Sequence, residues 1–148
     1  MKKWHKIFRE GVRSVESEEA MRALGREIAE LLEPGDALGL VGDLGAGKTR
    51  LVQGILAGLG AAEPGVSPTF SLVHEHNGGR LPAAHFDFYR MASSDEALSL
   101  GWDDYLDSGS VLLVEWADRF DGQLMPPHTV WLCFSRTGEN TRLVHCRC

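Results

Sequence analysis

The stretch Gly42-Asp43-Leu44-Gly45-Ala46-Gly47-Lys48-Thr49 decides the fold class of this chain. It follows a short apolar run, Ala37 to Val41, and precedes a segment whose apolar residues recur at helical spacing from Leu51 onward. A strand, a glycine-rich loop and a helix in this order are the context that a phosphate-binding loop requires. The sequence therefore predicts a P-loop, whose backbone N–H groups and helix dipole face phosphate oxygens.

The fixed positions of this loop predict individual roles. Lys48 is expected to reach the β- and γ-phosphates of a nucleotide, and the Thr49 hydroxyl to ligate Mg²⁺. The chain has no Asn-Lys-x-Asp segment of the kind that recognises guanine in GTPases, so ATP is the expected nucleotide. The residues expected to contact it are Asp43, Leu44, Gly45, Ala46, Gly47, Lys48, Thr49 and Arg50.

A carboxylate beside the phosphates is the second requirement of a Mg²⁺-nucleotide site. Glu115 follows the apolar run 111–114, and Asp87 follows the run 83–86. Both runs read as buried strands, and ligands of open α/β sheets gather at the carboxyl ends of strands. One carboxylate can hold the metal while the other orients the attacking water.

The remaining pattern predicts an α/β fold, namely a P-loop NTPase-like mixed sheet flanked by helices in three α/β/α layers. No repeat or linker divides the sequence, so a single P-loop ATPase domain over residues 1–148 is expected. Asn77 and Gly78 form a hairpin-turn signal between two strand-like stretches. Besides 37–41 and 111–114, the segments predicted as strands are 4–8, 69–76, 81–88, 130–134 and 142–145.

Three helices are predicted from apolar spacing and capping residues. Ser17 is expected to cap a helix that ends near Leu32, and the second helix ends near Gly58. Ser93 and Glu96 form a capping-box pattern that begins a short third helix.

Composition and charge exclude several classes of protein. The formal net charge is −6, so the chain is a poor stand-alone nucleic-acid binder, and any RNA would be held by another subunit. Apolar runs are far shorter than a membrane span, and no apolar region follows the basic N-terminus. A cytoplasmic location without a membrane partner is therefore expected. Three cysteines are too few for a disulfide framework or a four-cysteine metal site.

Four segments in fixed order resemble the TsaE (YjeE) family of bacterial ATPases. They are the loop at 42–49, Ser67-Pro68-Thr69-Phe70, His85-Phe86-Asp87-Phe88-Tyr89-Arg90 and Val114-Glu115-Trp116. The resemblance implies an ATPase that supports formation of N6-threonylcarbamoyladenosine beside the anticodon of tRNAs reading codons that begin with A. It also implies a partner, the heterodimer of TsaB and the transferase TsaD, which ATP hydrolysis resets; tRNA is contacted only through that complex.

The same resemblance implies roles for single residues. Thr69 matches a switch-like loop near the γ-phosphate, and Trp116 matches an active-site aromatic residue. His85 is interpreted as a structural histidine. Arg142 is interpreted as solvated surface, with a phosphate or partner contact as the alternative. The residues implied in catalysis are Asp87, Lys48, Thr69 and Trp116, and those implied in Mg²⁺ binding are Thr49 and Glu115.

Two other functions share the phosphate-binding loop. A small-molecule P-loop kinase would transfer the phosphate to a metabolite, but no arginine-rich lid segment follows the central helices. In a non-hydrolysing binding module, nucleotide occupancy alone would control partner affinity. Such a module and a slow ATPase share every sequence motif, so this alternative stays open.

Overall fold

The computed structural model describes residues 2–43, 45–61 and 73–147. Its centre is a mixed seven-stranded sheet with the strand order β1-β7-β6-β2-β5-β4-β3. Strands β6, β2, β5 and β4 run parallel, whereas β7, β1 and β3 pair antiparallel with their neighbours. The strands are β1 (Val12–Val15), β2 (Ala37–Val41), β3 (Val73–His76), β4 (Ala83–Asp87), β5 (Val111–Glu115), β6 (Val130–Arg136) and β7 (Arg142–Arg147).

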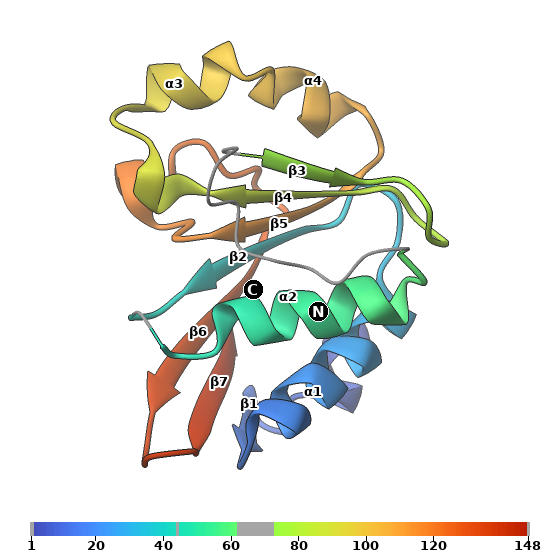
Figure 1. Cartoon of the computed structure of the whole chain (residues 1–148), viewed down its shortest axis with the longest axis vertical. Helices are drawn as coiled ribbons and strands as arrows, with labels where there is room; N and C mark the ends of the chain where they lie inside the picture. The colour runs from blue at the N-terminus through green and yellow to red at the C-terminus, as the bar shows by residue number, and fades with distance from the viewer. Residues whose placement is uncertain (1, 44, 62–72, 148) are drawn as a thin grey trace.

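Helices cover both faces of the sheet, as the sequence predicts (Figure 1). Helices α1 (Glu18–Leu31) and α2 (Lys48–Gly58) lie side by side on one face, and α3 (Ser94–Ser99) and α4 (Trp102–Asp107) lie on the other. The central strand β5 serves both layers because its side chains alternate. Val111 and Leu113 belong to the core under α1 and α2, whereas Leu112 and Val114 belong to the core under α3 and α4.

Helices α1 and α2 pack backbone against backbone. A Cβ atom on Gly54 would lie 2.1 Å from the Arg22 carbonyl oxygen, and one on Gly25 would lie 2.4 Å from the Leu51 carbonyl oxygen. Only glycine permits this approach. Ser17 caps α1 as predicted, since its side chain accepts a hydrogen bond of 3.0 Å from the Ala20 N–H. The helix that carries the P-loop is thus held firmly against α1.

The predicted strand at 4–8 is wrong. The segment contains a 3₁₀ helix, η1 (Lys2–Lys6), and the N–H of Phe8 donates to the carbonyl of Trp4. Trp4, Ile7 and Phe8 are all buried. Their i, i+3, i+4 spacing is that of a helical turn, so the alternation expected of a strand is absent.

Smaller differences concern short elements. The sequence did not predict β1 or α4, each of which is held by its neighbours rather than by a strong local pattern. Neither hydrogen bond of the predicted capping box is present at α3: Glu96 accepts from the N–H of Ala92, the residue before the cap, and the Ser93 side chain makes no capping hydrogen bond. The hairpin of β3 and β4 is confirmed for the described residues, while positions 69–72 lie outside them.

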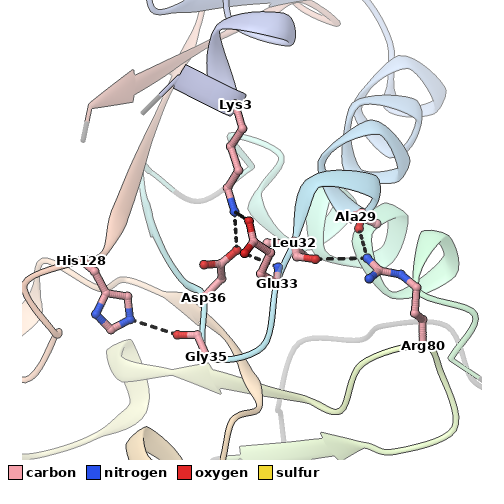
Figure 2. Close-up of polar contacts among 8 residues, drawn as sticks. All are labelled: Lys3, Ala29, Leu32, Glu33, Gly35, Asp36, Arg80 and His128. Carbon is pink, nitrogen blue, oxygen red and sulfur yellow. Dashed lines mark hydrogen bonds and ion pairs between the residues drawn. The ribbon is translucent and has the colours of Figure 1, made fainter.

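Polar contacts fasten the amino end of β2, opposite the end that carries the P-loop (Figure 2). The Lys3 ammonium pairs with Glu33 at 3.1 Å and with Asp36 at 2.9 Å, which ties the N-terminal segment to the α1–β2 connection. Arg80, in the turn between β3 and β4, donates to the carbonyl of Ala29 in the last turn of α1 at 2.6 Å. None of the helices in the described ranges is long and apolar enough to cross a bilayer.

Candidate nucleotide-binding site

The carboxyl ends of three parallel strands bring the two acidic candidates together. Glu115 at the end of β5 is paired in register with Leu40 of β2 and with Asp87 of β4. The P-loop begins directly after β2, so both carboxylates lie beside the start of α2. This is the sheet edge at which α/β proteins bind ligands.

The described part of the P-loop has the curled backbone that phosphate binding needs. Gly47 has a φ of 104° and forms the N-cap of α2. Glycine is required here by this conformation, whereas a Cβ atom would meet only the flexible end of Met21, at 2.6 Å from Cε. The N–H of Ala46 donates to the Asp43 carbonyl at 3.1 Å, which closes the turn before the helix.

Lys48 is folded onto the loop itself. Its ammonium donates to the carbonyl of Gly42, and to that of Asp43 at 2.9 Å. The residue is only 5% exposed, and burial lowers the pKa of Lys48, while Glu115 and other nearby carboxylates oppose that shift. A buried ammonium whose partners are neutral carbonyls has unused capacity for an anion.

Thr49, Glu115 and His85 form a continuous chain of hydrogen bonds. The Thr49 hydroxyl donates to Glu115 Oε1 at 3.1 Å, and His85 Nε2 lies 2.6 Å from Glu115 Oε2. Glu115 is 4% exposed and His85 is fully buried. The sequence interpretation of His85 as merely structural therefore missed a direct contact with the proposed metal ligand.

Asp87 is a second buried carboxylate in the same site. Its Oδ1 accepts from the N–H of Tyr89 at 3.0 Å, and Arg90 Nε lies 3.7 Å from Oδ2. Burial raises the pKa of Asp87, with the charge of Glu115 acting in the same direction, and the Tyr89 hydrogen bond and Arg90 oppose it. A carboxylate held in this way is suited to accept a proton or a hydrogen bond from water.

The indole ring of Trp116 borders the P-loop lysine, and the Tyr89 ring packs against that indole. Trp116 has a φ of 58°, a left-handed conformation that is rare outside glycine. The Lys48 ammonium lies 4.4 Å from the centre of the indole ring of Trp116. The centre of the Tyr89 ring lies 4.8 Å from the centre of the same indole ring. Trp116 therefore lies beside the P-loop lysine, and the active-site role that the resemblance implies for it stays a prediction.

A cavity of about 640 Å³ extends from these residues. Its size is typical of small-ligand sites. Its outer walls are the start of α1, with Ser17 and Glu18, and the β6–β7 turn, with Glu139 and Asn140. Arg142 in β7 donates from Nη2 to the Gly45 carbonyl at 3.0 Å. Arg142 is thus more than solvated surface: it contacts the P-loop backbone, because β-sheet pairing places the last hairpin against the loop.

Comparison with known proteins identifies the family. The sequence model described as threonylcarbamoyl adenosine biosynthesis protein TsaE matches residues 15–144. The tRNA threonylcarbamoyladenosine biosynthesis protein TsaE of Bacillus subtilis is 42% identical over 130 residues, which are 88% of this chain and 80% of that protein. This chain belongs to the TsaE family. The resemblance found in the sequence is thereby confirmed.

Other members of the TsaE family support the same assignment. The protein of the same name from Haemophilus influenzae is 38% identical over 115 residues, 74% of this chain and 73% of that protein. The crystal structure of Bacillus subtilis YdiB superposes with a TM-score of 0.78 at 33% identity, covering 91% of this chain and 82% of the other. The α/β fold predicted from the sequence is thus confirmed.

The TsaE-like site contains most of the predicted residues. Arg50 lines the cavity and lies 3.5 Å from Glu18, and Gly45 supplies the carbonyl bound by Arg142. Thr69 and Leu44 lie outside the described residues. The predicted residues that line the cavity are Gly45, Gly47, Lys48, Thr49, Arg50, Asp87, Glu115 and Trp116, whereas the predicted residues Asp43 and Ala46 are not part of its lining. Their individual roles remain predictions.

The donor set fits Mg²⁺ held together with a nucleotide. Mg²⁺ keeps several waters and usually takes only one or two protein oxygens beside substrate phosphates. The adjacent Thr49 hydroxyl and Glu115 carboxylate match that requirement. Within the described ranges no group of three or more His, Cys, Asp or Glu side chains could form a protein-only metal cage.

Proposed function

We propose that this chain binds and hydrolyses Mg²⁺-ATP as the ATPase subunit for N6-threonylcarbamoyladenosine formation in tRNAs that read codons beginning with A. The observation that carries the proposal is the meeting of Lys48, Thr49, Glu115 and Asp87 around one cavity at the end of the P-loop strand. The names of the TsaE relatives support the pathway.

Binding relies on the P-loop and its lysine. Loop N–H groups and the start of α2 face the phosphates, and Lys48 exchanges its two loop carbonyls for phosphate oxygens. Thr49 and Glu115 hold the metal, which neutralises phosphate charge when it is bound. The cavity walls beyond the loop leave room for the nucleoside.

Hydrolysis requires an oriented water and stabilised charge. Asp87 accepts a hydrogen bond from the water that attacks the γ-phosphorus, and the bond to the ADP oxygen breaks. Lys48 and the loop N–H groups bear the charge that develops on the phosphate oxygens, and phosphate and a proton are released. The raised pKa of Asp87 suits a group that interacts with the proton of water.

The proposed partner is the TsaB–TsaD heterodimer. With a net charge of −6, the chain leaves tRNA binding to the complex, and a cytoplasmic location is part of the proposal. Turnover by the isolated chain is expected to be slow. A group supplied in trans accelerates hydrolysis in P-loop GTPases by about 10³- to 10⁵-fold, so the heterodimer is expected to stimulate turnover.

The test is reconstituted tRNA modification by the heterodimer, followed over several turnovers. ATP should support repeated turnover, while a non-hydrolysable analogue or the Lys48→Ala variant should support at most one. Equal turnover with the analogue would favour the nucleotide-gated binding module. No effect of the chain on modification, together with phosphorylation of a metabolite, would favour the kinase.

A further inference from the structure

We infer that His85 is a positioning residue, which binds Oε2 of Glu115 so that Oε1 faces Thr49 and the metal position. The inference rests on the proposed Mg²⁺-nucleotide function and adds a residue to it. His85 itself does not touch the nucleotide or the metal.

The pairing of β4 with β5 places His85 on the same face of the sheet as Glu115 and diagonally adjacent to it. Residues 85 and 87 of β4 point to the same face of the sheet, because side chains alternate along a strand. The register pairs Asp87 with Glu115 and His85 with Leu113, so the imidazole reaches diagonally across one strand spacing. The result is the contact of 2.6 Å between His85 Nε2 and Glu115 Oε2.

The chemistry of the pair fixes the direction of this hydrogen bond. A carboxylate that binds a cation is ionised and only accepts, so the inferred role requires Nε2 to carry the hydrogen and donate it to Glu115. The other ring nitrogen, Nδ1, is buried, and no described residue gives it a hydrogen-bond partner. The contact with Glu115 is what favours histidine here.

Glu115 is consequently held at both carboxylate oxygens. His85 fixes Oε2 and the Thr49 hydroxyl fixes Oε1, so the carboxylate plane is set before nucleotide arrives. Residues that orient a metal-binding side chain typically contribute about 10- to 100-fold to metal affinity. Loss of the His85 donor should therefore weaken Mg²⁺ binding, although every metal-binding atom remains.

Two amide variants separate positioning from packing. The side-chain nitrogen of Gln in His85→Gln can occupy the place of Nε2, whereas that of Asn in His85→Asn falls near Nδ1 and does not reach Glu115. The readout is the Mg²⁺ concentration that half-saturates ADP binding, measured by calorimetry with ADP and MgCl₂. His85→Asn should raise it about 10- to 100-fold and His85→Gln should restore it to about threefold of wild type.

Controls make each outcome decisive. His145→Asn alters an exposed histidine of β7 and should leave the Mg²⁺ dependence unchanged. Equal Mg²⁺ dependence in His85→Asn and wild type, or equal losses in His85→Asn and His85→Gln, would overturn the inference. ADP binding by wild type that does not depend on Mg²⁺ would overturn the proposed metal site and this inference with it.

A double-mutant cycle gives a second test. In a Glu115→Gln background the carboxylate is gone, so His85→Asn should add little further loss of Mg²⁺ affinity. Additive losses would show that His85 acts on something other than Glu115. Thermal unfolding of each variant, recorded alongside, checks that the protein measured is folded.

Discussion

The hydroxyl of Thr49 and the carboxylate of Glu115 are joined by a hydrogen bond of 3.1 Å, although 66 positions separate them in sequence. The bond links the first turn of α2 to the end of β5. The metal position proposed between them is therefore assembled by the fold of the chain alone. Binding of the Mg²⁺-nucleotide then needs only to replace the hydrogen bond between two side chains that are already oriented toward the metal position.

Glu115→Gln tests the metal position. The amide keeps the size of the side chain but loses the negative charge that favours a cation, so the Mg²⁺ needed for half-maximal ADP binding should rise at least about tenfold. Calorimetric titration of Mg²⁺ in the presence of ADP measures this. Glu139→Gln is the matched control, because Glu139 is an exposed carboxylate on the far wall of the cavity. A similar shift in both variants would point to general electrostatics.

Asp87→Asn should make the folded chain more stable and its ATP hydrolysis slower. Burial raises the pKa of Asp87, so its ionised form destabilises the folded chain at neutral pH. Above the folded-state pKa this cost is fully present, and it disappears as the pH falls below the unfolded-state pKa. Asp87→Asn should therefore unfold at higher urea than wild type at about pH 7, with a smaller difference at about pH 4.5.

The same substitution should lower ATP hydrolysis by about 100-fold or more, since the group that accepts from water is lost. Asp103→Asn on the exposed face of α4 is the control for both measurements and should change neither. An Asp87→Asn protein that hydrolyses ATP at the wild-type rate would remove Asp87 from the mechanism.

Arg142→Met tests the contact between the last hairpin and the P-loop. The variant loses the charged donor to the Gly45 carbonyl, a contribution of about 1 kcal/mol, so ADP should bind about fivefold more weakly. Arg136→Met is the control, because the hydrogen bonds of Arg136 go to the carbonyls of Gly138 and Glu139 in its own turn. Unchanged ADP affinity in Arg142→Met would mean that the loop needs no such support.

Arg80→Met tests the polar contacts at the opposite end of the sheet. Arg80 satisfies a carbonyl in the last turn of α1, where a cation also suits the helix dipole. Its loss should destabilise the chain by about 1 kcal/mol in urea unfolding, with ADP affinity unchanged. Arg26→Met, which removes an exposed ion pair to Glu19, should cost less than about 0.5 kcal/mol. Equal losses in the two variants would contradict the capping role.

The sequence predicts the centre of this molecule well because its signals there are local. The P-loop lies between a strand and a helix, and Glu115 and Asp87 each end a buried apolar run. Because ligands of open α/β sheets gather at the carboxyl ends of strands, these positions are enough to predict that both carboxylates lie near the P-loop. By contrast, the short segment with Trp4, Ile7 and Phe8 was predicted as a strand, although the spacing of these apolar residues is that of a helical turn.

Contacts between distant segments explain what the sequence did not predict. Arg142 reaches Gly45 only because β7 pairs with β6 beside β2, a register that local pattern does not reveal. His85 had a usable signal, since strand alternation places it on the same face as Asp87. Its partner could not be deduced without the pairing of β4 and β5.

Phosphate release from ATP, measured for the purified chain with and without the TsaB–TsaD heterodimer, is the decisive experiment. The proposed function predicts slow release alone and at least about tenfold stimulation by the heterodimer, with both lost in Lys48→Ala and when Mg²⁺ is omitted. Release that persists in Lys48→Ala, or that the heterodimer leaves unchanged while no complex forms, would contradict an ATPase that serves tRNA threonylcarbamoylation.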